Sequence, residues 1–142
     1  MRVLASLLGS LILCCPAYPQ AKIVTAAQAN GTYRSGSNEI KILALGHNKL
    51  RIQMDLSWEY KTPDGPMANV GTALGEATIE NDTATFRPPE TEDCTVTIKF
   101  LPGNRIKVSE DHMLNCGWGF NVSSNGTYRK IRAGKPKFDE DR

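Results

Sequence analysis

The sequence predicts an all-β fold, an antiparallel up-and-down barrel of about eight or nine short strands. Alternating apolar and polar segments follow one another between turn compositions, and no amphipathic helical stretch interrupts them after the first 21 residues. The pentapeptide Asn-Gly-Thr-Tyr-Arg occurs twice, at 30–34 and at 125–129. We expect the two copies to form the first and last strands and to pair, because closure hides the sheet edges. Were the copies far apart, a β-sandwich would be the better interpretation.

The first 21 residues have the composition of a signal peptide. Arg2 provides the positive start, and Val3 to Leu13 is a run of apolar and small residues. This run is too short to cross a bilayer, which needs roughly 20 apolar residues. Cleavage after Ala17 fits the small-residue rule better than cleavage after Ala21. We therefore expect a secreted or periplasmic protein with no stable membrane insertion after cleavage.

The chain has four cysteines. Cys14 and Cys15 fall inside the signal peptide, and lipid attachment to either is disfavoured because a small residue does not precede it. The other two, Cys94 and Cys116, predict a disulfide bond in an exported protein. The bond would close a loop of about 23 residues and stabilise the fold by roughly 3 kcal/mol in the chain-entropy model. The alternative is a pair of buried free thiols.

The β-domain is expected to span residues 30–131. Short strands are predicted at 31–34 and 39–45, each ended by a turn composition. The clearest strand follows them, and a loop is predicted from Lys61 to Pro66, which holds two prolines and an Asp-Gly pair. In that strand one dry face alternates with polar residues, as in a sheet packed on one side; the dry face carries Leu50, Ile52, Met54, Leu56 and Trp58.

Small residues occupy one face of the next predicted strand, from about Asn69 to Glu80. These small residues leave room inside the predicted sheet. Trp and Phe side chains from neighbouring strands fill this room, or it remains open as a cavity. The second interpretation predicts a site for a small apolar ligand, whereas the first predicts an ordinary core. The residues concerned, as core or as ligand lining, are Met54, Trp58, Gly71, Ala73, Gly75, Trp118 and Phe120.

The second half of the chain predicts further strands at 83–87, 94–100, 106–108, 116–122 and from Gly126 onward. Pro88 to Asp93 is predicted to be a stiff acidic loop, and Pro102-Gly103-Asn104 closes a hairpin. The polar tail, 132–142, is predicted to be disordered.

No catalytic or metal-binding set is visible in the sequence. The nucleophile elbow, the S-x-x-K pair, the H-E-x-x-H helix and the phosphate-binding glycine loop are all missing. His47 and His112 fall in predicted turns, and the carboxylates of Glu90, Glu92 and Asp93 share one loop instead of flanking a pocket. Lys plus Arg (17) nearly balances Asp plus Glu (15), so nothing points to nucleic acid. We predict a non-enzymatic protein without cofactor or metal.

The motifs Gly75-Glu76-Ala77, the Cys94 strand, the stretch from Cys116 to Val122 and Gly126-Thr127-Tyr128 carry a family resemblance. They resemble small exported bacterial β-domains of mostly uncharacterised proteins, similar to those that follow the helical domain of lysozyme-inhibitor-type lipoproteins. That helical domain has no counterpart in this sequence. The opening Gly31-Thr32-Tyr33 is similar to the first-strand G-x-W of lipocalin-like barrels.

The resemblance implies an exported binding protein of the bacterial envelope. The favoured hypothesis is a protein-interaction or inhibitor-like module, whose target would be a cell-wall hydrolase. The alternative is a lipocalin-like carrier of a small apolar ligand. A filled barrel interior would argue against the carrier.

Overall fold

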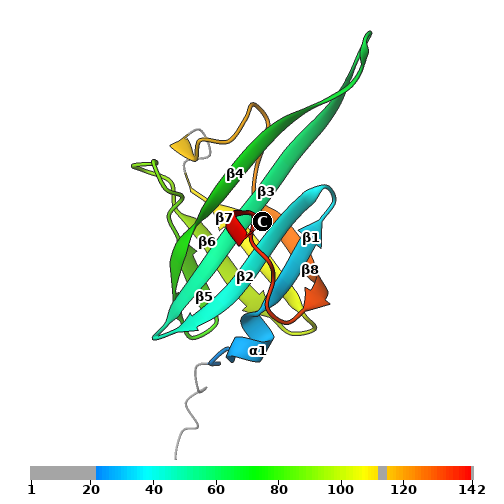
Figure 1. The fold of residues 1–142 in the computed structure, drawn as a ribbon. Coiled ribbons are helices and arrows are strands. Elements are labelled where there is room, and N and C mark those ends of the chain that lie inside the picture. Colours follow the sequence, from blue (N-terminus) through cyan, green and yellow to red (C-terminus); the bar gives the residue numbers. More distant parts are fainter. Residues whose placement is uncertain (1–21, 112–114, 142) are drawn as a thin grey trace, which may run out of the picture.

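The computed structural model describes residues 22–111 and 115–141; the predicted signal peptide and His112 lie outside these ranges. The fold is a closed barrel in which each strand pairs with its neighbours in the sequence (Figure 1). A short helix, α1 (Ala26–Ala29), precedes the barrel, and a 3₁₀ helix, η2 (Asp139–Asp141), follows it. The eight strands are β1 (Gly31–Ser35), β2 (Asn38–Gly46), β3 (Lys49–Thr62), β4 (Gly65–Glu80), β5 (Thr83–Phe86), β6 (Val96–Leu101), β7 (Arg105–Glu110) and β8 (Gly126–Ala133).

The first and last strands close the barrel. β1 and β8 pair antiparallel, with Gly31 opposite Ala133 and Arg34 opposite Arg129. The predicted contact between the two pentapeptide copies is therefore confirmed, and the sandwich interpretation is wrong.

Each pentapeptide copy makes the same two bonds. The Tyr33 hydroxyl donates to the carbonyl of Ala29 (2.8 Å), and the Tyr128 hydroxyl donates to that of Ser124 (2.9 Å), four residues earlier in both cases. The asparagine side chains accept backbone N–H groups of neighbouring strands: Asn30 from Ala44 (2.6 Å) and Asn125 from Glu110 (2.8 Å). The repeat thus has a structural role at the start of each strand, because it satisfies backbone groups that the sheet ladder leaves unpaired.

The barrel interior is filled by side chains. A Cβ at Gly71 would lie 2.9 Å from the Trp118 ring, and one at Gly75 would lie 3.3 Å from the Phe86 ring and 3.2 Å from Pro89. The steric interpretation of the small-residue face is therefore confirmed at these two positions. Large side chains with almost no exposed surface complete the interior: Tyr33, Ile40, Ile42, Leu50, Ile52, Met54, Phe86, Val96, Ile98, Ile106 and Tyr128.

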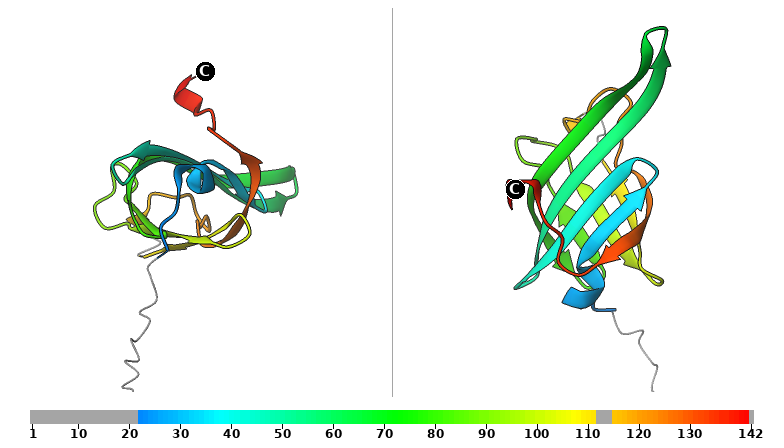
Figure 2. Two further views of the ribbon diagram at one scale, coloured as in Figure 1. Left: turned by 90° about the horizontal axis from the view of Figure 1, so that it is seen from below. Right: turned by 45° about the vertical axis from the view of Figure 1, so that its right-hand side comes forward.

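The loop predicted from Lys61 to Pro66 is wrong. β3 and β4 remain paired as far as Thr62 opposite Gly65, so only Pro63 and Asp64 form the turn. Proline presets the turn backbone, and Gly65 follows with φ +123°, so the Pro-Asp-Gly sequence makes a tight hairpin. The resulting hairpin projects beyond the barrel (Figures 1 and 2).

The ninth strand, predicted at 116–122, is also wrong. Gly117 (φ +73°) and Asn121 (φ +60°) take left-handed backbone conformations that interrupt an extended strand. The segment is a loop, in which Trp118 packs against the core while Phe120 is exposed. The core prediction for Phe120 is therefore incorrect.

The tail predicted to be disordered is ordered in its described part. β8 continues to Ala133, and Phe138 is buried on the outside of the barrel with only 1% of its surface exposed. The tail contacts Lys41 on β2 and Arg51 and Gln53 on β3, all far away in the sequence. A polar composition alone therefore gave the wrong expectation for this segment.

Candidate functional site

The outer half of the β3–β4 hairpin has no neighbouring strand. β2 pairs with β3 only as far as Asp55, and β5 pairs with β4 only from Ala77 onward. Both strands continue well past these points, so the hairpin extends from the end of the barrel that lies opposite α1 (Figure 1). The elements that position the candidate site are therefore the two longest strands of the sheet.

Aromatic and apolar side chains occupy one face of this projecting hairpin. Trp58 and Tyr60 stack, with ring centroids 5.2 Å apart and an interplanar angle of 24°. Met67 lies opposite Tyr60 on β4 and is 53% exposed, while Trp58 is 39% exposed. This face continues the inward parity of β3, where Leu56 is buried. The core prediction for Trp58 is wrong, because the barrel wall ends before the strand does.

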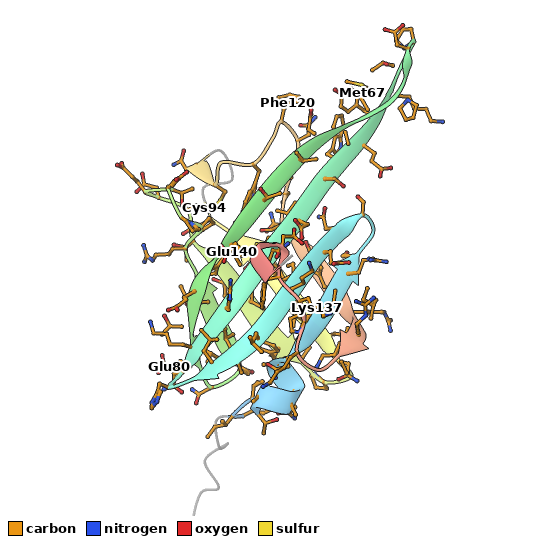
Figure 3. The ribbon with its side chains drawn as sticks, viewed as in Figure 1. Met67, Glu80, Cys94, Phe120, Lys137 and Glu140 are labelled. Atoms are coloured by element: carbon orange, nitrogen blue, oxygen red, sulfur yellow. A yellow bond between two sulfur atoms is a disulfide. The ribbon has the colours of Figure 1, made fainter. Side chains whose placement is uncertain are left out.

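The loop that contains Phe120 lies against the free edge of β4. The Gly119 N–H donates to the Val70 carbonyl (3.0 Å), and the Asn69 side chain donates to the Phe120 carbonyl (2.8 Å). A side chain at Gly119 would clash, because its Cβ would lie 2.7 Å from the Val70 oxygen. Phe120 is 79% exposed at the same end of the molecule as Met67 (Figure 3).

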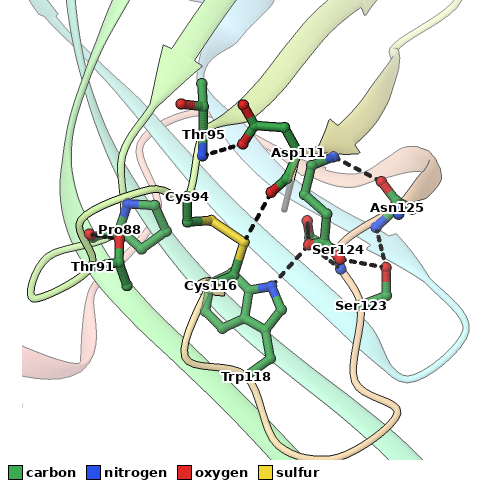
Figure 4. Close-up of a disulfide and its surroundings, with 11 residues drawn as sticks. Pro88, Thr91, Cys94, Thr95, Asp111, Cys116, Trp118, Ser123, Ser124 and Asn125 are labelled. Carbon is green, nitrogen blue, oxygen red and sulfur yellow. Dashed lines mark hydrogen bonds between the residues drawn. A yellow bond between two sulfur atoms is a disulfide. The ribbon is translucent and has the colours of Figure 1, made fainter. Parts of the chain in front are cut away.

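A disulfide and a carboxylate hold this loop in place (Figure 4). The predicted bond between Cys94 and Cys116 is confirmed, with an S–S distance of 2.06 Å. The Glu110 carboxylate, at the end of β7, accepts from the Trp118 indole N–H (2.8 Å) and the Ser123 hydroxyl (2.8 Å). These contacts fix the base of the loop while leaving Phe120 in solvent.

We call the exposed apolar residues of this end the tip patch. Seven large apolar residues are exposed within the described ranges, and four of them lie here. Large exposed apolar groups gathered in one place mark interaction surfaces, whereas scattered ones do not. Aromatic and Met side chains are also the types enriched in protein interfaces. The tip patch consists of Trp58, the half-buried Tyr60 and Met67 on one face of the hairpin, Val70 on its other face, and Phe120 of the adjacent loop.

A separate groove of about 510 Å³ runs along the outside of β3 and β4. Its walls come from outward-facing Gln53 and Thr72, from the Pro88 to Thr91 loop and from Asp139 of the tail. Glu90, a member of the predicted acidic loop, lines it, and so does Gly117. The groove is open to solvent and is lined by polar and apolar residues alike, so it differs from the internal apolar cavity expected as one alternative from the sequence.

The predicted lining residues do not come together as an internal cavity. Met54 is fully buried in the core, Gly71 and Gly75 are covered by other side chains, and Ala73 packs against the core. Sequence reasoning missed Tyr60, Met67 and Val70. The period of two that places Trp58 on the dry face extends to Tyr60, and this was the available signal.

Within the part of the chain that the structure describes, no cluster of His, Cys, Asp or Glu could hold a metal ion. In the same ranges, no helix is long and apolar enough to cross a membrane. Comparison of the chain with family models, with curated proteins and with solved structures finds no match.

Proposed function

We propose that this chain is an exported, non-enzymatic binding protein that engages a protein partner through the tip patch. The observation that carries this proposal is the concentration of exposed aromatic and apolar side chains on a hairpin that projects from the barrel. Burial of such side chains supplies most of the free energy in protein interfaces. The disulfide fits an oxidising compartment, as expected for an exported protein.

The shape of the hairpin favours a concave partner. A narrow two-stranded projection, with Trp58, Tyr60 and Met67 on one face and Val70 on the other, fits a cleft better than a flat surface. This is the mode of an inhibitor-like module, and a hydrolase with an open substrate cleft is the partner class that we propose. The alternative, a carrier with its ligand inside the barrel, is disfavoured because interior positions such as Met54 and Phe86 are filled.

The test is capture of a partner from a bacterial envelope extract with three forms of the chain. The wild type is compared with the double variant Met67→Ser/Phe120→Ser and with the control Ile131→Ser, which removes an exposed apolar residue from β8. We expect the wild type and the control to retain the same stoichiometric partner. The tip variant should bind it at least about tenfold more weakly, since interface hot spots are aromatic and apolar anchors.

Because the replaced side chains are exposed, the variants should unfold within about 0.5 kcal/mol of the wild type. Loss of binding would then reflect the surface and not the fold. Equal retention by all three forms, or no stoichiometric partner at all, would contradict the proposal.

A further inference from the structure

The described tail of the chain, residues 134–141, forms a strap across the outside of the barrel. β8 ends at Ala133, next to the start of β1, and Gly134 (φ +85°) turns the chain. The strap then passes over β2 and reaches β3, as the red segment in Figure 1 shows. Its first half is mostly exposed, with Lys135 and Lys137 in solvent. Only its second half is anchored.

Phe138 is the apolar anchor of the strap. It lies against outward-facing positions of the sheet, yet it is almost completely buried. The Arg51 guanidinium lies 4.6 Å from the centre of its ring, which is a favourable cation–π distance. Burial of the ring and its cation–π contact with Arg51 therefore act together to anchor the strap.

Gln53 recognises the next residue at two points. Its side-chain amide donates to the Asp139 carboxylate (2.7 Å), and its carbonyl oxygen accepts the Asp139 backbone N–H (3.0 Å). Gln53 is only 4% exposed although it points out of the barrel. A buried amide that bonds both the backbone and the side chain of one residue selects a segment with a carboxylate at that position.

Two cations complete the recognition of acidic residues. Lys41 Nζ lies 3.5 Å from the Asp139 carboxylate, and Arg51 lies 2.6 Å from that of Glu140. Both carboxylates remain more than half exposed, so these ion pairs are weak and are screened by salt. Three consecutive residues thus provide the side chains that hold the strap, while the tether before them is solvated.

We propose that the outer face of β2 and β3 around Lys41, Arg51 and Gln53 is a peptide-binding site. It recognises a segment in which a Phe precedes two acidic residues at the start of a 3₁₀ turn, and the chain's own strap occupies it in cis. A partner protein that carries a segment of this type exchanges with the strap.

The neighbouring groove favours such exchange. The groove of about 510 Å³ begins beside Gln53 and Asp139 and continues to the Pro88 to Thr91 loop. A partner segment longer than the strap can enter it and gain contacts. This inference concerns a different surface from the tip patch, so the two proposals can fail separately.

The test uses the full chain and a fluorescent peptide of residues 135–142, Lys-Pro-Lys-Phe-Asp-Glu-Asp-Arg. In Phe138→Ala the strap loses its anchor and should free the site. We expect this variant to bind the peptide at least about tenfold more tightly than the wild type, because a tethered segment competes at a millimolar effective concentration. Adding Gln53→Ala should weaken binding at least about tenfold again. A control peptide with Ala in place of Phe should bind neither form.

Asp139→Ala/Glu140→Ala is the second opening variant, since both residues are exposed and their loss should not disturb folding. Circular dichroism checks that each variant is folded. A folded opening variant that does not bind the peptide overturns the proposal. Equal binding by wild type and opened chain overturns occupancy in cis, and equal binding of the control peptide overturns recognition of Phe. Met67→Ser/Phe120→Ser should leave peptide binding unchanged.

Discussion

The pentapeptide at 30–34 and its copy at 125–129 lie on adjacent strands that run in opposite directions. Their asparagines therefore sit at opposite ends of the barrel. At both ends the Tyr hydroxyl bonds the carbonyl four residues earlier, and at both ends the Asn side chain accepts a neighbouring strand's N–H. The same five residues thus provide equivalent hydrogen bonds to backbone groups at both ends of the barrel.

The surroundings of the two copies differ. Asn30 is nearly buried and is the C-cap of α1, a turn of helix that begins at the Thr25–Gln28 capping box and lies at the barrel opening seen in Figure 2 (left). Asn125 is exposed, and its end of the barrel is covered by the loop that Glu110 and the disulfide hold. Both ends are held by contacts between residues distant in the sequence, since Lys130 Nζ donates to the Gln28 carbonyl (2.7 Å) at the first end. Only the second end is also held by the disulfide, and this is the end that bears the tip patch.

Removing the disulfide should affect the two ends unequally and has the largest expected effect. The double variant Cys94→Ala/Cys116→Ala should lower the free energy of unfolding by roughly 3 kcal/mol, because the unfolded chain regains the entropy of an open loop. Urea denaturation measures this loss. Native-state hydrogen exchange should show faster opening at 116–125 than at Ala29 and Asn30. Equal acceleration at both ends would show that the ends are not independent.

The two glycines of the repeat should tolerate alanine differently. Both have φ +153°, which strains any other residue. A Cβ at Gly31 would also lie 2.7 Å from the Arg132 carbonyl oxygen, whereas the nearest atom at Gly126 is 3.6 Å away. We expect Gly31→Ala to cost about 2–3 kcal/mol and Gly126→Ala about 1 kcal/mol. Thermal or urea denaturation compares them, and equal costs would show that the seam relaxes around Gly31.

The two tyrosines should behave alike, with the smallest effect. Tyr33→Phe removes the bonds to the Ala29 and Gln28 carbonyls, and Tyr128→Phe removes the bond to Ser124 and the longer one accepted from Asn38 (3.4 Å). Each should cost about 1 kcal/mol in urea denaturation at neutral pH. A much larger cost at one copy would break the equivalence that the shared bonds imply.

The stability of the protein at alkaline pH also depends on these two tyrosines. Burial raises the pKa of Tyr128 to about 12 and raises the pKa of Tyr33 as well. Above about pH 10 the unfolded chain loses protons that the folded chain retains, so stability falls as pH rises. The double variant Tyr33→Phe/Tyr128→Phe should lose less stability between about pH 8 and about pH 11 than the wild type.

Local sequence patterns were enough to predict the barrel and its closure. They were not enough to predict where β3 and β4 lose their neighbouring strands. The alternation from Leu50 to Trp58 correctly predicts a strand. Its inward-facing side chains are buried in a core, however, only where β2 and β5 flank the β3–β4 hairpin. The segment from Cys116 to Val122 alternates as a strand would, while Gly117 and Asn121 permit the left-handed conformations that break it.

The strap shows a second limit. A single Phe among charged residues is typical of a disordered tail. Phe138 is nonetheless buried, with the Arg51 guanidinium over its ring, and Gln53 is hydrogen bonded to Asp139, 86 positions away. Contacts between such distant residues depend on the finished barrel, and no periodicity within 132–142 encodes them.

The continuous pairing of β3 with β4 has a consequence for how the projecting hairpin could bind. Every residue of β3, from Lys49 opposite Thr78 to Thr62 opposite Gly65, has a partner on β4. The tip is therefore an extension of the barrel wall, stiffened by the same ladder that forms the core. A partner would bind a preorganised hairpin whose conformational entropy was already lost on folding. Association would then require little further ordering, and strain applied at the tip would be transmitted directly to the barrel wall.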